Sequence, residues 1–210
     1  IKNKSIMENG LSEERRGLIT GSPCHVLFPK RSAEKGQLTY AKLLAKERVF
    51  KYSDNATTWQ MEHGHMGEVV AMEWFLENID KKAIKPEFVK KGEFGGSGDC
   101  LTENYGVDFK CPTSLEKWLE YLTEGVSNQQ YWQAQMYMFI YDRPKWKVCA
   151  YLVETNYMSD NGVTYPISPD KRCIENTIDK LDGFEEMLLE KSKFVIEKRN
   201  EFIAIYKNLL

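Results

Sequence analysis

The chain has 210 residues and a mass of 24.5 kDa, a length that corresponds to one domain with a sizeable hydrophobic core. Hydrophobic residues make up 42% and charged residues 29% of the chain, with 14 glycines and 7 prolines, which excludes disordered, collagen-like and low-complexity proteins. The 29 basic and 31 acidic residues give a net charge of −2, which excludes a protein that coats nucleic acid through bulk positive charge.

The charge is unevenly distributed along the sequence. Residues 1–60 carry 11 basic and 6 acidic side chains, whereas residues 61–110 carry 6 and 10. An acidic middle is typical of an ordinary solvated face, or of a cation-binding centre beside a basic anchor for an anionic partner. Charge alone does not choose between these two interpretations.

Five cysteines lie far apart in the sequence, without a C-x-x-C pair or histidines at zinc-ligand spacing. We therefore expect neither a disulfide framework nor a structural zinc site. No signal-like segment opens the chain, and no apolar run approaches the ~20 residues that cross a bilayer. We expect a cytoplasmic protein without a membrane partner.

The first expected elements in chain order are helical. Residues 12–16 predict a short helical turn, and Ser22 followed by Pro23 predicts a helix start with Ser22 as the N-cap. Such a start exposes backbone N–H groups that favour an anion. A longer helix is expected at 38–49.

A second long helix is expected at 58–79, where Gly64 and Gly67 would allow close packing against a neighbouring element. Three short strands follow, at 86–91, 98–101 and 105–111. Gly-Gly-Ser-Gly and Glu-Asn-Tyr-Gly separate them and are typical of turns, so we expect an antiparallel meander.

Helices at 114–122 and 128–141 and a strand at 146–154 come next. In the last ~35 residues, apolar side chains recur at helical spacing, at Ile174, Ile178, Leu181, Leu188, Val195 and Phe202. We therefore expect a long C-terminal helix. Without repeats or linkers, residues 1–210 form one α/β domain, with a core at about 12–155 and a helical extension at about 172–210.

Two acids and a lysine converge in the expected strands. Asp108 and Lys110 are two residues apart on one strand and so share a face, and a tight hairpin would bring Asp99 beside Asp108. Adjacent carboxylates repel each other unless a cation is present, and Mg²⁺ prefers such oxygen ligands. A nearby lysine could orient a water or offset transition-state charge. A surface hairpin with a solvated acid and lysine would show the same short pattern.

The sequence around this hairpin is more specific. Asp-Phe-Lys-Cys-Pro at 108–112 resembles the motif of the lambda exonuclease and YqaJ-type viral recombinase family of PD-(D/E)XK nucleases. Three further blocks occur in the family's order, at 15–22, 64–68 and 133–135. The resemblance implies a single-domain restriction-endonuclease-like fold, with a central mixed sheet flanked by helices.

The resemblance also implies a metal site, whose ligands would be Glu68, Asp99, Asp108 and the main-chain carbonyl of Phe109. The implied catalytic residues are Glu68, Asp108, Lys110 and Gln135. A glutamine of the family helps to position the water and the lysine, and Gln135 matches it better than Gln133 does. Without the resemblance, Glu68 is a plain helix acid and the glutamines are packing residues.

The DNA contacts implied by the resemblance are at the terminal 5′-phosphate, which lambda-type exonucleases bind where this chain has Arg15, Ser22 and Ser97. The alignment of Gly17 leaves Arg16 open as the phosphate ligand, and we favour Arg15. Without the family, Ser22 would be only a helix cap.

We therefore expect a deoxyribonuclease dependent on Mg²⁺, or on Mn²⁺, with one or two ions per site. It would degrade double-stranded DNA ends 5′→3′ and leave 3′ single-stranded overhangs for phage-type recombination. The resemblance further implies a homotrimeric ring and a single-strand annealing partner, in a bacterial host or virus-infected cell. The alternatives are a structure-specific endonuclease or resolvase of the same fold, and a non-catalytic DNA-end-binding subunit. Iron–sulfur relatives are disfavoured because four grouped cysteines are missing.

Other conspicuous side chains have less specific interpretations. His63 and His65 are two residues apart, so they would point apart on a helix, and together with His25 they are interpreted as ordinary polar positions. Trp59 and Met61 could form an apolar wedge at a duplex end, but we favour a place in the helix core.

Overall fold

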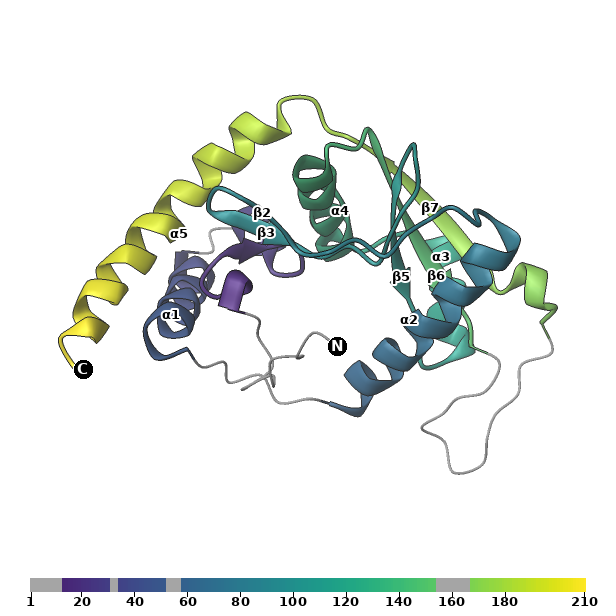
Figure 1. Cartoon of the computed structure of the whole chain (residues 1–210), viewed down its shortest axis with the longest axis horizontal. Helices are drawn as coiled ribbons and strands as arrows, with labels where there is room; N and C mark the ends of the chain where they lie inside the picture. The colour runs from purple at the N-terminus through teal and green to yellow at the C-terminus, as the bar shows by residue number, and fades with distance from the viewer. Residues whose placement is uncertain (1–12, 31–33, 52–57, 154–166) are drawn as a thin grey trace, which may run out of the picture.

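A computed structural model describes residues 13–30, 34–51, 58–153 and 167–210 (Figure 1). The helices are α1 (Glu34–Phe50), α2 (Trp59–Asn78), α3 (Leu115–Thr123), α4 (Asn128–Tyr141) and α5 (Phe184–Lys207). The strands are β1 (Ile19–Thr20), β2 (Val89–Lys91), β3 (Phe94–Gly96), β4 (Cys100–Leu101), β5 (Gly106–Lys110), β6 (Lys145–Tyr151) and β7 (Cys173–Asp179). Short 3₁₀ turns occur at Glu13–Arg15, Cys24–Leu27 and Pro169–Lys171.

The strands form two mixed sheets. One has the order β1-β3-β2, with β1 parallel and β2 antiparallel to β3. The other has the order β4-β5-β6-β7, in which β5 and β6 are parallel and the two outer pairs are antiparallel. Helices α3 and α4 connect the parallel pair. The predicted α/β fold with mixed β-structure, flanking helices and a long C-terminal helix is confirmed.

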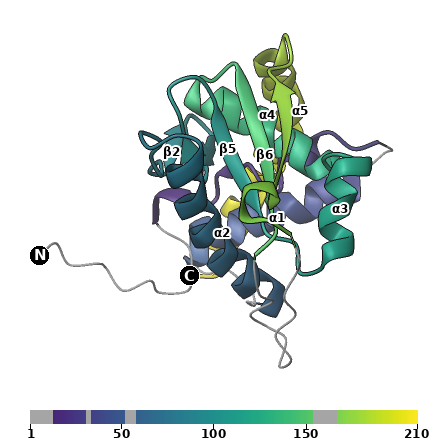
Figure 2. The same cartoon turned by 90° about the vertical axis from the view of Figure 1, so that its right-hand side faces the viewer.

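The helices cover both faces of the four-stranded sheet, as Figure 2 shows, with α2 on one side of β5 and β6 and α3 on the other. Helix α4 packs against both sheets, and residues 133–140 within it are all buried. Helix α5 runs alongside α1 (Figure 1). Within the described residues, no helix combines the length and apolar character required to span a bilayer.

Serine and threonine caps explain why three of the helices begin where they do. The side chains of Thr58, Ser114 and Ser127 each accept a hydrogen bond from a backbone N–H three residues on. Gln130 also accepts a bond from the Ser127 N–H, which completes a capping box. The helices expected at 58–79, 114–122 and 128–141 are confirmed as α2, α3 and α4.

The expected three-stranded meander is wrong, because the chain forms two hairpins that belong to different sheets. Gly95 and Gly96, expected in a turn, lie in β3. A Cβ atom would lie 2.4 Å from the Phe88 ring at Gly95 and 2.7 Å from the Tyr137 ring at Gly96. These glycines therefore permit close packing, and the chain leaves the first sheet only after β3.

The C-terminal prediction is also partly wrong, because Cys173–Asp179 is strand β7 rather than helix. Ile174 and Ile178 are both buried. Their spacing of four is an even number, so it places them on one face of a strand as well as on one face of a helix. The helix begins only at Phe184, after Gly183 with a φ of 69°.

The predicted helix start at Ser22 is a four-residue 3₁₀ turn whose N-cap is Pro23, without a side-chain capping bond. Ser22 is therefore not a helix cap, and a turn of this length does not provide the aligned N–H groups that were expected there. The predicted helical turn at 12–16 appears as the 3₁₀ turn Glu13–Arg15, and Ser12 lies outside the described residues. The strand expected at 146–154 is β6, and residue 154 also lies outside them.

Candidate active site

Three acids and a lysine converge at the carboxyl end of β5. Pairing of Cys100 with Val107 in the β4–β5 hairpin places Asp99 next to Asp108. The Phe109 N–H donates a hydrogen bond of 2.7 Å to Asp99 Oδ2. The backbone of β5 thereby holds the Asp99 carboxylate beside its own Asp108.

Asp108 and Lys110 form an ion pair. They are two residues apart on β5, so both side chains project from the same face of the strand. Asp108 is 3% exposed, whereas about a quarter of the Lys110 side chain remains accessible. Burial lowers the pKa of Lys110, but the nearby Asp108 and Asp99 carboxylates outweigh it and raise the pKa above its usual range. Lys110 is therefore a persistent cation in the free protein.

Glu68 on α2 faces the same cluster. Burial raises its pKa, Lys110 and His65 lower it, and Asp108 raises it. Burial also raises the pKa of Asp99 well above its usual range, with a further contribution from Asp108. One lysine does not balance three carboxylates, so repulsion among the acids disfavours their full ionisation without a further cation.

Close packing of α2 brings Glu68 to this position. A Cβ atom on Gly67 would lie 2.5 Å from Cys111 Cβ, so only glycine lets the helix approach the end of β5 so closely. One turn earlier, the ring of buried His63 lies 3.3 Å from the Pro112 carbonyl oxygen through Nε2. His65 is exposed, which confirms that the two histidines point apart. His63 and Gly67 thus anchor α2 to the 108–112 motif.

A cavity of about 310 Å³ opens on the cluster. Its lining residues are Gly64, Glu68, Phe109, Lys110, Cys111, Pro112, Lys117, Glu120 and Tyr121. The last three belong to α3 and were missed by the sequence analysis. The Ser114 cap directly after the motif was the available signal, because it places the first turns of α3 beside the end of β5.

The two candidate glutamines of α4 point to different parts of the molecule. Gln135 donates to the Asp179 carbonyl oxygen at 2.9 Å and accepts from the Leu181 N–H at 2.9 Å, so the link between β7 and α5 occupies its amide. Gln133 donates to the Tyr137 hydroxyl at 3.2 Å. Burial raises the pKa of Tyr137, and Asp108 adds to the rise, so Gln133 lies on the side of the acids. The geometry thus places Gln133, rather than the predicted Gln135, on the side of the acids.

Arg15 and Ser22 line a second cavity of about 310 Å³, together with Thr20, His25 and Gln129 among others. Gln133 donates to Ser22 Oγ at 3.5 Å, which links this cavity to Tyr137 and the acid cluster. Arg16 lines a different cavity, with Arg48 and Glu93. Ser97 is exposed between β3 and β4 and does not line the Arg15 cavity.

An ion-pair network centred on a buried arginine, which the sequence did not predict, holds the segment that carries Arg15. Arg199 of α5 is fully buried and donates to the Gly17 carbonyl oxygen at 3.0 Å and to Glu93 at 2.8 Å. Glu47 of α1 accepts from the Gly17 N–H at 2.9 Å. Gly17 has a φ of 67°, and a Cβ there would lie 2.1 Å from Arg48 Cγ. Helices α1 and α5 therefore fix this turn from both sides.

Trp59 and Met61 are 46% and 44% exposed at the start of α2, so their expected place in the helix core is wrong. The buried residues of this helix are His63, Gly67, Ala71 and Phe75. Trp59 and Met61 thus present apolar surface to solvent.

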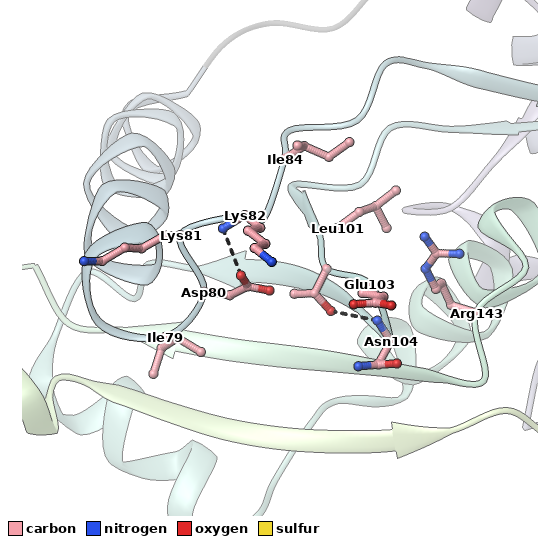
Figure 3. A pocket seen from close by; sticks show the side chains of 10 residues that line it. Ile79, Asp80, Lys81, Lys82, Ile84, Leu101, Glu103, Asn104 and Arg143 are labelled. Atoms are coloured by element: carbon pink, nitrogen blue, oxygen red, sulfur yellow. Dashed lines mark hydrogen bonds between the residues drawn. The ribbon is translucent and has the colours of Figure 1, made fainter.

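A further cavity of about 610 Å³ lies at the opposite end of β5, between the end of α2 and the β4–β5 turn. Figure 3 shows Asp80 and Lys82 on one side of it and Arg143 on the other. The Asp80 carboxylate accepts from the Lys82 N–H at 2.9 Å. This cavity is lined by both acidic and basic side chains that lie apart from one another, so it lacks the convergent acids of the cluster around Asp108.

No protein-family model matches the sequence, and no curated protein matches it. Solved structures do match. The alkaline exonuclease LHK-Exo from Laribacter hongkongensis has a TM-score of 0.72 and 18% identity, over 93% of this chain and 94% of its own. Its complex with dAMP matches equally well. A phage-related exonuclease from Haemophilus somnus 129PT has a TM-score of 0.71 and 16% identity, over 90% and 96% of the two chains. The chain thus has the fold of these exonucleases over nearly its whole length.

Proposed function

We propose that the protein is a metal-dependent exonuclease of the lambda exonuclease and YqaJ-type family, acting 5′→3′ on double-stranded DNA ends. The convergence of Glu68, Asp99, Asp108 and Lys110 at the end of β5 carries this proposal. The cluster occurs in a chain that shares the fold of known exonucleases. A solvated surface hairpin does not account for a 3% exposed Asp108 or for the opposing acid on α2.

The donor set fits a hard divalent ion. Glu68, Asp99, Asp108 and the Phe109 carbonyl would hold one or two Mg²⁺ or Mn²⁺ ions through oxygen atoms alone. When bound, the ion supplies positive charge that polarises the scissile phosphate and acidifies a nearby water. The raised pKa values of Glu68 and Asp99 support this assignment, because a cation would relieve the repulsion that raises them.

Lys110 and Gln133 act on the reacting groups. The raised pKa of Lys110 keeps it protonated, so it donates hydrogen bonds to the phosphate oxygens as their charge grows, or orients the attacking water. Gln133 lies on the acid side of α4 and takes the positioning role that the resemblance suggested for Gln135. Both side chains are held by bonds to neighbours, which fixes their geometry before substrate arrives.

The cavity around Arg15 would receive the terminal 5′-phosphate. A guanidinium and a serine hydroxyl are suitable donors for a phosphate dianion, and Arg15 rather than Arg16 shares a cavity with Ser22. Ser97, two residues before Asp99, would contact the same strand. Phosphate contacts of this kind carry no sequence information, so the enzyme would accept any duplex end.

Linear duplexes with and without a 5′-phosphate, and a covalently closed circle, test the proposal in Mg²⁺ and in EDTA. We expect mononucleotides from phosphorylated linear ends in Mg²⁺, with 3′ single strands left behind. Cleavage of the closed circle would replace the proposal with an endonuclease or resolvase. Binding of ends without hydrolysis under Mg²⁺ or Mn²⁺ would replace it with an end-binding subunit.

The assembly and setting proposed for the protein follow from the resemblance. They are a homotrimeric ring around DNA, a single-strand annealing protein that receives the 3′ strand, and the cytoplasm of a bacterial host or virus-infected cell. Light scattering on the purified protein tests the ring directly, since a monomer or dimer at working concentrations would contradict it.

A further inference from the structure

Two cysteines and a glutamate gather on strands β6 and β7, away from the acid cluster. Cys149 pairs with Glu175 across the strands, and Tyr151 pairs with Cys173, so alternation places Cys149, Cys173 and Glu175 on one face. Their sulfur atoms and a carboxylate oxygen lie within 4.8 Å of one another. Cys149 packs in the cluster under α2 with Phe109. Asp108 and Lys110 alternate with Phe109, so their side chains leave β5 on the opposite face.

This donor set differs in kind from the carboxylates around Asp108. Thiolate sulfur favours zinc and other soft ions, and zinc accepts carboxylate oxygen as well. Two thiolates and one carboxylate leave a fourth tetrahedral position for water. The burial of the three residues is also compatible with an ion site. Cys149 is fully buried, Cys173 is half-buried and Glu175 is exposed, so an ion can reach the site from solvent on the Glu175 side.

Lys147 balances the charge of such a site. Its ammonium lies 2.6 Å from Glu175 Oε2, and the carboxylate has a second oxygen for an ion. Two thiolates, one carboxylate and Zn²⁺ carry a net charge of −1 by addition, which Lys147 offsets. Binding releases the two thiol protons to solvent.

We propose that Cys149, Cys173 and Glu175 bind one Zn²⁺ ion that joins β7 to β6. The sequence did not predict a zinc site, because its cysteines lie far apart in the chain. These cysteines come from strands that meet only through sheet pairing. Because β7 leads directly into α5, the ion would also steady the helix that carries Arg199.

Cobalt is a suitable probe, because thiolate-to-cobalt charge transfer absorbs in the near ultraviolet and oxygen ligands give no such band. The full-length reduced protein is titrated with Co²⁺ in a non-thiol reductant. We expect the band to saturate at one equivalent and to disappear when Zn²⁺ is added. The acid cluster holds oxygen donors, so Glu68→Gln and Asp108→Asn should leave the band unchanged.

Variants locate the ligands. Cys149→Ala and Cys173→Ser should each abolish the band, and Glu175→Gln should weaken binding about tenfold. Cys24→Ala and Cys100→Ala, at buried cysteines elsewhere, are matched controls that should retain it. Circular dichroism checks that each variant is folded, and Cys173→Ser serves if Cys149→Ala does not fold.

Thermal unfolding is the second readout. The acid cluster would also hold Zn²⁺, so the comparison is made in the Asp108→Asn background. Zn²⁺ should raise the midpoint of Asp108→Asn more than that of Asp108→Asn/Cys173→Ser, because only ions that bind the folded state shift the equilibrium. The absence of a thiolate band in the folded wild type would overturn the proposal. A band that survives in Cys149→Ala and Cys173→Ser would overturn it equally.

Discussion

The acid cluster and the Arg15 cavity, to which we assign catalysis and recognition of the 5′-phosphate, are built in different ways. Asp99, Asp108 and Lys110 come from one hairpin, in which the Phe109 N–H holds the Asp99 carboxylate. Close packing of Gly67 against Cys111 then adds Glu68 from α2. The segment that carries Arg15 depends on α1 at Gly17 and on Arg199 near the end of the chain. The hairpin part of the proposed catalytic site is therefore assembled locally, whereas the proposed recognition of a DNA end depends on contacts distant in sequence. Five experiments test this contrast.

Loss of Lys110 should have the largest effect. We expect Lys110→Ala to reduce single-turnover hydrolysis about 10³-fold, because a positioned donor at the reacting phosphate is removed. Binding of a phosphorylated duplex, measured by fluorescence anisotropy, should remain within a factor of a few. Lys145→Ala, at an exposed lysine on β6, is the control. Equal loss of binding and turnover would assign Lys110 to binding instead.

Arg199→Ala should destabilise the segment that carries Arg15, because it removes the hydrogen bonds from α5 to Gly17 and Glu93. Removal of a buried cation that bonds Gly17 and Glu93 should cost about 3 kcal/mol, at the lower end of the usual range because Glu93 is partly exposed. Denaturant unfolding measures the loss. Below the unfolding transition, preference for phosphorylated ends should fall while hydrolysis of unphosphorylated ends persists. A parallel loss of both activities would contradict the separation of the two regions.

Lys198→Ala is the control for Arg199, since its ion pair with Glu201 lies on the surface of the same helix. We expect its free energy of unfolding and its end preference to match the wild type.

Gly67→Val tests whether close packing of α2 positions Glu68 in the cluster. The added side chain would clash with Cys111, so α2 must shift, at a cost of about 1–3 kcal/mol. Glu68 would move with it, and we expect the Mg²⁺ concentration for half-maximal activity to rise. Gly64→Ala is the matched control three residues earlier, where a Cβ meets no atom within 4 Å. If both variants behave alike, close approach at Gly67 does not position Glu68.

Arg15→Ala should lower the preference for 5′-phosphorylated ends about 10–100-fold, the worth of a hydrogen bond to a charged group. The effect should appear in KM for phosphorylated ends, with hydrolysis of unphosphorylated ends nearly unchanged. Arg16→Ala, whose side chain lines another cavity, should retain the preference. The reverse result would assign the phosphate to Arg16.

The pH dependence of stability should be the smallest effect. In EDTA, the folded protein binds protons more tightly at Glu68 and Asp99 than the unfolded chain does, because their pKa values are raised. Stability should therefore fall as pH rises from the ordinary carboxylate range through the raised values, by up to ~1.4 kcal/mol per pH unit for each group. Thermal midpoints in EDTA measure the slope. Mg²⁺ and Asp99→Asn should each flatten it, and an unchanged slope in both would contradict the repulsion described for the cluster.

Helix α4 shows where prediction from the sequence stopped. Its limits, 128–141, were predicted correctly because helical spacing of side chains is a local signal, and the structure shows Ser127 as the cap at its start. Which face of α4 meets the acids could not be predicted, since residues 133–140 are all buried and the helix has no polar side to orient it. The sequence therefore did not show that Gln133, rather than Gln135, lies on the side of the acids. Strand β7 was missed for a related reason. Two apolar residues four positions apart lie on one face of a helix and also on one face of a strand, so their spacing does not distinguish the two.

Local sequence patterns were sufficient to predict the α/β fold class, most helices, and the placement of Asp99, Asp108 and Lys110 on one hairpin. Strand alternation and the pairing of adjacent strands depend on neighbours in the chain, so local residues suffice to predict them. The packed structure was needed to show which arginine shares a cavity with Ser22, and that Arg199 supports the segment that carries Arg15. It alone brought Cys149 and Cys173 together. These results depend on which faces of distant elements pack together, and burial of the core settles that only when the whole chain is folded.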